Sequence, residues 1–107
     1  MKIQYETRQT NTIQHEVEFD YECEIFLSYD AAWDNAISYF GFYKNKANEI
    51  VDTTIYPNNA IIYKTHINDF TPELLIKKIY SENKNVQKIN RDQFFIELQK
   101  AISNFIS

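Results

Sequence analysis

Sixteen consecutive residues, Thr12 to Leu27 (TIQHEVEFDYECEIFL), alternate in polarity along most of their length. The odd-numbered positions from Ile13 onward are apolar apart from His15, and a repeat of two residues places them all on one face of a strand, which no helix can do. Because strands usually run for about 3 to 10 residues, we expect a bulge or bend near Asp20, or a strand that crosses a strongly twisted sheet. The fold must therefore contain a sheet.

Further strands are predicted at three places. The segment KIQYET, residues 2–7, alternates in the same way and precedes the polar turn RQTN. Pro57, Asn58 and Asn59 separate two β-rich runs, DTTIY and AIIYKTHI, and both residue types favour turns, so a hairpin is expected there. A short strand is also expected at VQKI, residues 86–89.

Helices are predicted at three places. Apolar residues at helical spacing over residues 31–40, followed by Gly41 as a stop signal, predict the first helix. A proline and a glutamate that suit a first helical turn predict the second helix, over residues 72–81. Asn90 and Gln93 form a capping box ahead of the third helix. Its apolar stripe consists of Phe94, Leu98, Ala101, Ile102 and Phe105.

Length and composition predict one small domain. A chain of 107 residues with 44% hydrophobic and 16% aromatic residues is long enough to bury one core. It contains one glycine and two prolines, fewer than an all-β sandwich with many tight turns needs, which favours substantial helix. We therefore predict a single α+β domain over residues 1–107, with a mostly antiparallel sheet packed by two to three helices, including an amphipathic C-terminal helix.

The sequence also predicts the cellular compartment and the absence of a disulfide, a membrane span and a cofactor. Cys23 is the only cysteine, so no disulfide can form within the chain, and its place on the apolar face predicts a core position. The N-terminal residues lack the apolar run of a signal peptide, and no run of 18 apolar residues occurs, so we expect a cytoplasmic protein without a membrane span. A chain with one glycine has no glycine-rich phosphate loop, and we expect no cofactor.

Five acidic side chains occupy the second face of the alternating run, and we call them the acidic row: Glu16, Glu18, Asp20, Glu22 and Glu24. On one strand they would be spaced by about 6.6 Å, along a line of about 26 Å. Residues 1–43 hold eight acidic side chains against two basic ones, so the negative net charge of −4 is concentrated in this part of the chain. Such a surface repels the phosphates of nucleic acids.

Three interpretations of the acidic row lead to different functions. It can be a solvated sheet face whose charges pair with lysines of a neighbouring strand. It can bind a basic protein partner, because a line of carboxylates steers association with a groove rich in Lys and Arg. The third interpretation is a metal site, but carboxylates spread along a strand do not converge on one ion, so we expect no bound metal.

Two histidines and an aromatic segment are the other candidate residues. His15 and His66 are the only histidines and the candidates for acid and base catalysis on RNA, although a position in the apolar register is more typical of a structurally satisfied histidine. Four aromatic residues lie within five positions of the segment SYFGFYKNK, more than one buried face can hold. Tyr39 and Tyr43 are therefore candidate interface anchors, and the alternative is a small core beneath the following loop.

Together these patterns predict a non-enzymatic inhibitory binding protein. The most concrete form is an immunity protein, or antitoxin, that neutralises a nuclease toxin by occluding its basic active-site cleft with the acidic row. We expect a basic protein partner, a monomer or a 1:1 complex, and no direct binding to nucleic acid or membrane. A viral or phage inhibitor of a host nucleic-acid enzyme would use the same surface. Alternatives from other classes are a small RNA-processing enzyme that uses His15 and His66, and a scaffold that forms a homodimer through its aromatic residues.

Overall fold

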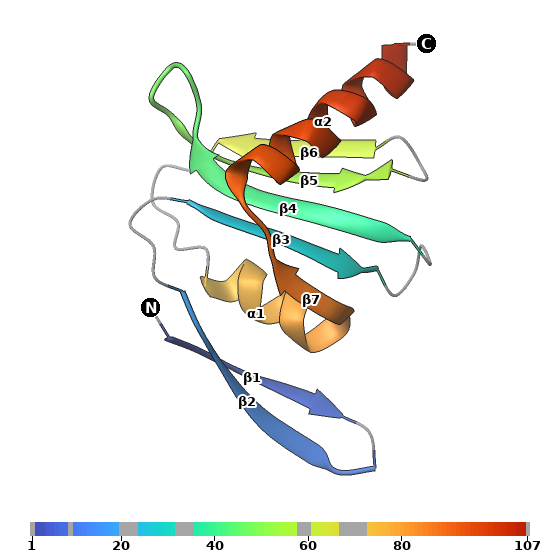
Figure 1. Ribbon diagram of the computed structural model, residues 1–107. Helices are drawn as coiled ribbons and strands as arrows, with labels where there is room; N and C mark the ends of the chain where they lie inside the picture. Colours follow the sequence, from blue (N-terminus) through green and yellow to red (C-terminus); the bar gives the residue numbers. More distant parts are fainter. Residues whose placement is uncertain are drawn as a thin grey trace.

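The structure is a computed structural model that describes residues 2–8, 10–19, 24–31, 36–57, 61–66 and 73–106. Within those residues the chain forms seven strands and two helices (Figure 1). In chain order they are β1 (Lys2–Arg8), β2 (Thr12–Glu18), β3 (Ile25–Asp30), β4 (Ile37–Lys44), β5 (Ile50–Tyr56), β6 (Ile61–His66), α1 (Glu73–Glu82), β7 (Lys84–Lys88) and α2 (Arg91–Ile106).

The strands form two antiparallel sheets. β1 and β2 pair only with each other among the described strands, and the remaining five follow the order β6-β5-β4-β3-β7. β3 therefore lies between β4, which follows it in the sequence, and β7, which comes after α1. The predicted α+β fold, with mostly antiparallel strands and a C-terminal helix, is confirmed.

Helices cover both faces of the five-stranded sheet (Figure 1). Successive side chains of a strand point to opposite faces, so Phe26 faces α2 whereas Ile25 and Leu27 face α1. The buried residues of the core under α2 are Phe26, Tyr43, Val51, Ile55, Phe94 and Ala101. The core under α1 also includes residues of the β1–β2 hairpin, and its buried members are Ile3, Phe19, Ile25, Leu27, Tyr29, Ala31, Phe40, Phe42, Ile76 and Ile79.

The alternating run of Thr12 to Leu27 is not one strand. β2 ends at Glu18, and β3 begins at Ile25 in the other sheet. Phe19, directly after β2, is buried in the core under α1, which anchors the end of the hairpin where the chain leaves it. A repeat of two residues has the same appearance in one long strand as in two strands that share a core, so the pattern does not reveal the break. Residues 20–23, which include Asp20 and Cys23, lie outside the described residues.

The helix predicted over residues 31–40 is wrong. Residues 37–44 are strand β4, and residues 32–35 lie outside the described part of the chain. Aromatic side chains favour strands, and Phe40 and Phe42 face α1 while Tyr43 faces α2, so both faces of β4 are buried. A strand buried on both faces loses the alternation that would have identified it. Gly41 lies in the middle of this strand and does not end a helix.

The remaining local predictions agree with the structure. β5 and β6 form the predicted hairpin, α1 begins within one residue of its predicted start, and β7 contains most of the predicted short strand. The capping box of α2 is formed reciprocally: the Gln93 backbone N–H donates to Asn90 Oδ1 at 2.8 Å, and the Asn90 N–H donates to Gln93 Oε1 at 3.1 Å. Neither described helix has the length and apolar character that a membrane crossing requires.

Candidate functional site

The structure separates the members of the acidic row. Glu16 and Glu18 lie on β2 with exposed side chains, whereas Asp20 and Glu22 fall outside the described residues. Glu24 lies just before β3 and is partly buried, and its carboxylate accepts a hydrogen bond from the guanidinium of Arg91 at the start of α2. The prediction of five carboxylates along one continuous strand is therefore wrong, because the strand that carries Glu16 and Glu18 ends before Asp20.

Glu16 and Glu18 belong to a larger exposed surface on the hairpin. We call this surface the outer hairpin face; it consists of Lys2, Gln4, Glu6, Arg8, Thr12, Gln14, Glu16 and Glu18, all exposed. Lys2 lies opposite Glu18, as expected if charges pair across neighbouring strands. Gln14 Nε2 donates to Glu6 Oε1 at 2.6 Å, while Glu16 lies opposite Gln4. The middle of this face therefore carries carboxylates and amides, and its two basic residues lie at the ends of β1.

The inner face of the hairpin carries His15 next to Tyr5, which contacts α1. The His15 ring stacks on Tyr5 with a centroid distance of 4.9 Å, and Tyr5 in turn contacts Tyr80 of α1 at 5.0 Å. His15 Nε2 also shares a hydrogen bond of 2.7 Å with Thr7 Oγ1. This is the environment of a structurally satisfied histidine. His66 is the last residue of β6, in the other sheet, and Figure 1 shows the hairpin on the far side of α1 from β6, so the structure does not bring the two histidines together.

The two candidate anchor tyrosines have different environments. Tyr43 is 2% exposed and its hydroxyl shares a hydrogen bond of 2.9 Å with Thr53 Oγ1, so the prediction that it lies at an interface is wrong. Its ring lies in the core under α2, against Phe26 and Phe94. Tyr39 is half-buried on the same face of β4, where burial and then the nearby Glu97 carboxylate raise the pKa of its hydroxyl. Only Tyr39 keeps part of its surface accessible.

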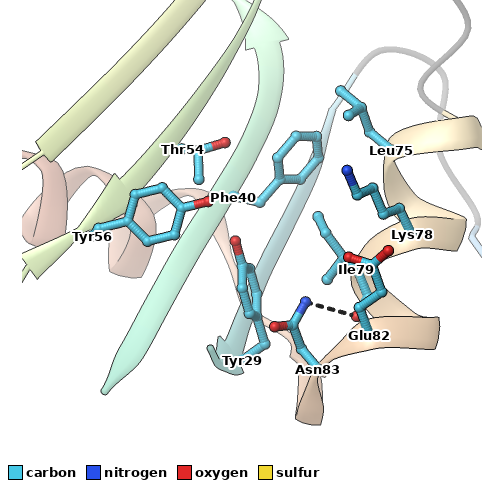
Figure 2. A pocket seen from close by; sticks show the side chains of 9 residues that line it. All are labelled: Tyr29, Phe40, Thr54, Tyr56, Leu75, Lys78, Ile79, Glu82 and Asn83. Carbon is cyan, nitrogen blue, oxygen red and sulfur yellow. Dashed lines mark hydrogen bonds between the residues drawn. The ribbon is translucent and has the colours of Figure 1, made fainter. Parts of the chain in front are cut away.

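A pocket that the sequence did not indicate lies between α1 and the sheet. It has a volume of about 350 Å³, and Figure 2 shows side chains from β3, β4, β5 and α1 around it. The residues that line it are Tyr29, Phe40, Thr54, Tyr56, Leu75, Lys78, Ile79, Glu82 and Asn83. Lys78 and Glu82 differ by four positions and therefore share one face of α1, which is the only sign of this site in the sequence.

Hydroxyl groups dominate the sheet side of the pocket. Burial, the adjacent Tyr56 and a hydrogen bond with it raise the pKa of Tyr29 well above its usual range, so Tyr29 is protonated at neutral pH. Ser38 lies opposite Tyr29 in the β3–β4 register, on the same face of the sheet. Ser38 is 0% exposed, and its Oγ has no hydrogen-bond partner within the described part of the chain. Buried hydroxyls are nearly always hydrogen-bonded, so this face of the sheet is unusual.

Metal binding and known relatives give no further indication of function. Within the described ranges, no three side chains of His, Cys, Asp or Glu are grouped so that they could hold a metal ion. Comparisons with protein-family models, with curated proteins and with solved structures find no match to this chain.

Proposed function

We propose that this chain is a non-enzymatic inhibitory protein that binds a basic protein partner through the outer hairpin face. One observation carries the proposal: every side chain of that face is exposed, and its three carboxylates, Glu6, Glu16 and Glu18, outnumber its two basic side chains. An isolated hairpin covered by α1 on one side leaves its other side open to a partner (Figure 1).

The shape of the hairpin suits a cleft. Strands of seven residues extend for about 23 Å, and a two-stranded ribbon is narrow enough to enter a groove between two walls. A groove lined by Lys and Arg attracts the carboxylates during approach, and this electrostatic steering raises the association rate. Such grooves are typical of nucleic-acid enzymes, which must hold phosphates.

The proposed partner is therefore a nuclease toxin, and the proposed role is that of a cytoplasmic immunity protein or antitoxin in a 1:1 complex. Glu16 and Glu18 would pair with basic residues of the cleft, and Tyr39 would add apolar contact only if the interface extends to α2. A viral or phage inhibitor of a host nucleic-acid enzyme would use the same face in the same way. We propose no catalytic role for His15, because its ring is engaged by Tyr5 and Thr7.

The test begins with capture of partners from native cell extract by the tagged protein at low salt, followed by elution with rising salt. The proposal expects a basic nuclease or toxin to be released stoichiometrically. With that partner, the double variant Glu16→Lys and Glu18→Lys should associate about tenfold more slowly or worse, with a weaker salt dependence.

The matched control is the double variant Glu73→Lys and Asp92→Lys. It changes the net charge by the same amount in the first turns of α1 and α2, outside the outer hairpin face. Circular dichroism must show that both variants are folded. Equal association rates for the two double variants, or wild-type binding by the hairpin variant, would contradict the proposal.

A further inference from the structure

The pocket of Figure 2 combines an apolar wall with two opposite charges. Phe40 and Ile79 are buried and Leu75 is half-buried, and these three side chains form the apolar part of the lining. Lys78 and Glu82 approach the same space from α1, and they are the only charged residues among the described ones that line it. The lining therefore has no net charge but a clear separation of charge.

Lys78 and Glu82 are available to a ligand. Neither side chain has a hydrogen-bond or ion-pair partner in the described ranges, although they lie one helical turn apart. A lysine placed four residues before a glutamate is the weaker orientation for an ion pair on a helix, since the reverse order suits the helix dipole better. A ligand that carries both charges would bind each of them without competing against a strong internal pair.

The sheet side of the pocket supplies neutral hydrogen-bonding groups. Tyr29 and Tyr56 are hydrogen-bonded to each other, and the Thr54 hydroxyl lies beside them in the lining. Protonated hydroxyls both donate and accept hydrogen bonds. They therefore suit a polar ligand and select for neither a positive nor a negative net charge. A volume of about 350 Å³ is at the small end of the range in which proteins bind small molecules.

We propose that this pocket binds one free α-amino acid with an aromatic or large aliphatic side chain. The carboxylate of the amino acid lies at Lys78, its ammonium group at Glu82, and its side chain against Phe40, Leu75 and Ile79. This site is separate from the outer hairpin face, and the inference does not depend on the proposed partner.

The first experiment uses the full chain and L-phenylalanine, with binding followed by calorimetry and by amide chemical shifts of α1 and β5. A ligand of this size in a half-open pocket is expected to have a dissociation constant of about 1 mM or lower. N-acetyl-L-phenylalanine lacks the ammonium charge and L-phenylalaninamide lacks the carboxylate, so each should bind about tenfold more weakly.

Substitutions give a second, independent test. Lys78→Met and Glu82→Gln each remove one charge from an exposed position and should weaken L-phenylalanine binding about tenfold. Lys77→Met is the matched control, since Lys77 is exposed on α1 and does not line the pocket, and its affinity should equal that of the wild type.

Three results would overturn the inference. No binding of L-phenylalanine, L-leucine or L-tryptophan at concentrations up to about 10 mM would exclude the site as proposed. If N-acetyl-L-phenylalanine bound as tightly as L-phenylalanine or more tightly, the pocket would be a site for simple anions. Equal loss of affinity in Lys77→Met would show that the effect is one of overall charge. The ligand series needs no variant, so the test stands even if a substitution impairs folding.

Discussion

Phe94 of α2 lies directly on Gly41 of β4. A Cβ atom placed on Gly41 would be 2.6 Å from Cζ of the Phe94 ring and less than 3 Å from both of its Cε atoms. Phe94 is 0% exposed and also contacts the rings of Phe26 and Tyr43, so it fills the centre of the core under α2. The only glycine of the chain is therefore placed where a helix approaches a strand too closely for a side chain.

Replacing Gly41 by alanine should destabilise the protein. We expect the free energy of unfolding to fall by about 1–3 kcal/mol, because the added methyl group displaces a ring that is enclosed on all sides. Urea denaturation of the wild type and Gly41→Ala measures this change. The control is Phe94→Leu in both backgrounds: the smaller side chain should cost less in the Gly41→Ala background than in the wild type. Additive effects of the two substitutions would show that the contact is not responsible.

Two buried hydroxyls should respond in opposite ways to removal. Ser38 Oγ has no partner in the described part of the chain, so Ser38→Ala should leave the free energy of unfolding unchanged or raise it by up to about 1 kcal/mol. Thr53 is equally buried but shares a hydrogen bond with Tyr43, so Thr53→Val should lower it by about 1–3 kcal/mol. Thermal and urea unfolding measure both variants. A clear loss of stability in Ser38→Ala would indicate a partner that the geometry does not reveal.

Stability should decrease at alkaline pH. Burial, and then the neighbouring Tyr5, raise the pKa of Tyr80 to about 12, and burial raises that of Tyr29 as well. An unfolded tyrosine loses its proton near pH 10, so between about pH 10 and pH 12 the folded state holds protons that the unfolded state has lost. The free energy of unfolding must therefore fall as the pH rises through this range, and these groups add no pH dependence below about pH 9.

Urea denaturation at pH 7, 9 and 11 tests this decrease. Tyr80→Phe should make the loss of stability between pH 9 and pH 11 smaller without abolishing it, since Tyr29 remains. Absorbance of tyrosinate in the folded protein gives a second readout. Titration of all eight tyrosines near pH 10 would contradict the expected shifts.

Structural features that depend only on residues close together in the sequence could be predicted. The capping box of Asn90 and Gln93 needs only a spacing of three residues, and the hairpin of β5 and β6 follows from two β-rich runs on either side of Pro57. The same reasoning failed for residues 37–44, where burial on both faces decides the structure. A helix and a doubly buried strand produce the same dense apolar run, and the partner that distinguishes them, Phe94, lies more than fifty residues away.

Only part of each candidate site could be predicted from the sequence, for a similar reason. Glu16 and Glu18 could be placed on one face because a repeat of two residues is local, but the end of β2 at Glu18 depends on burial of Phe19 beneath α1. The pocket needs α1 packed against three neighbouring strands, β3, β4 and β5, and no short stretch of sequence encodes that arrangement. The sequence placed Tyr43 at an interface because four aromatic residues are too many for one buried face. In the structure these residues are divided between the two faces of β4, and both faces are buried.

The pairing of β3 with β7 has a consequence for synthesis of the protein. Asp30 and Asn85, whose side chains are hydrogen-bonded, are 55 positions apart, so a ribosome that adds about 5–20 residues per second reaches Asn85 of β7 about 3–11 s after Asp30 of β3. During that interval β4 can pair with one edge of β3, but the backbone groups of the other edge have no strand to meet. Unpaired edges recruit other chains. The nascent protein is therefore most prone to aggregation between the synthesis of β3 and that of β7, and a chaperone that covers the open edge of β3 would act in this interval.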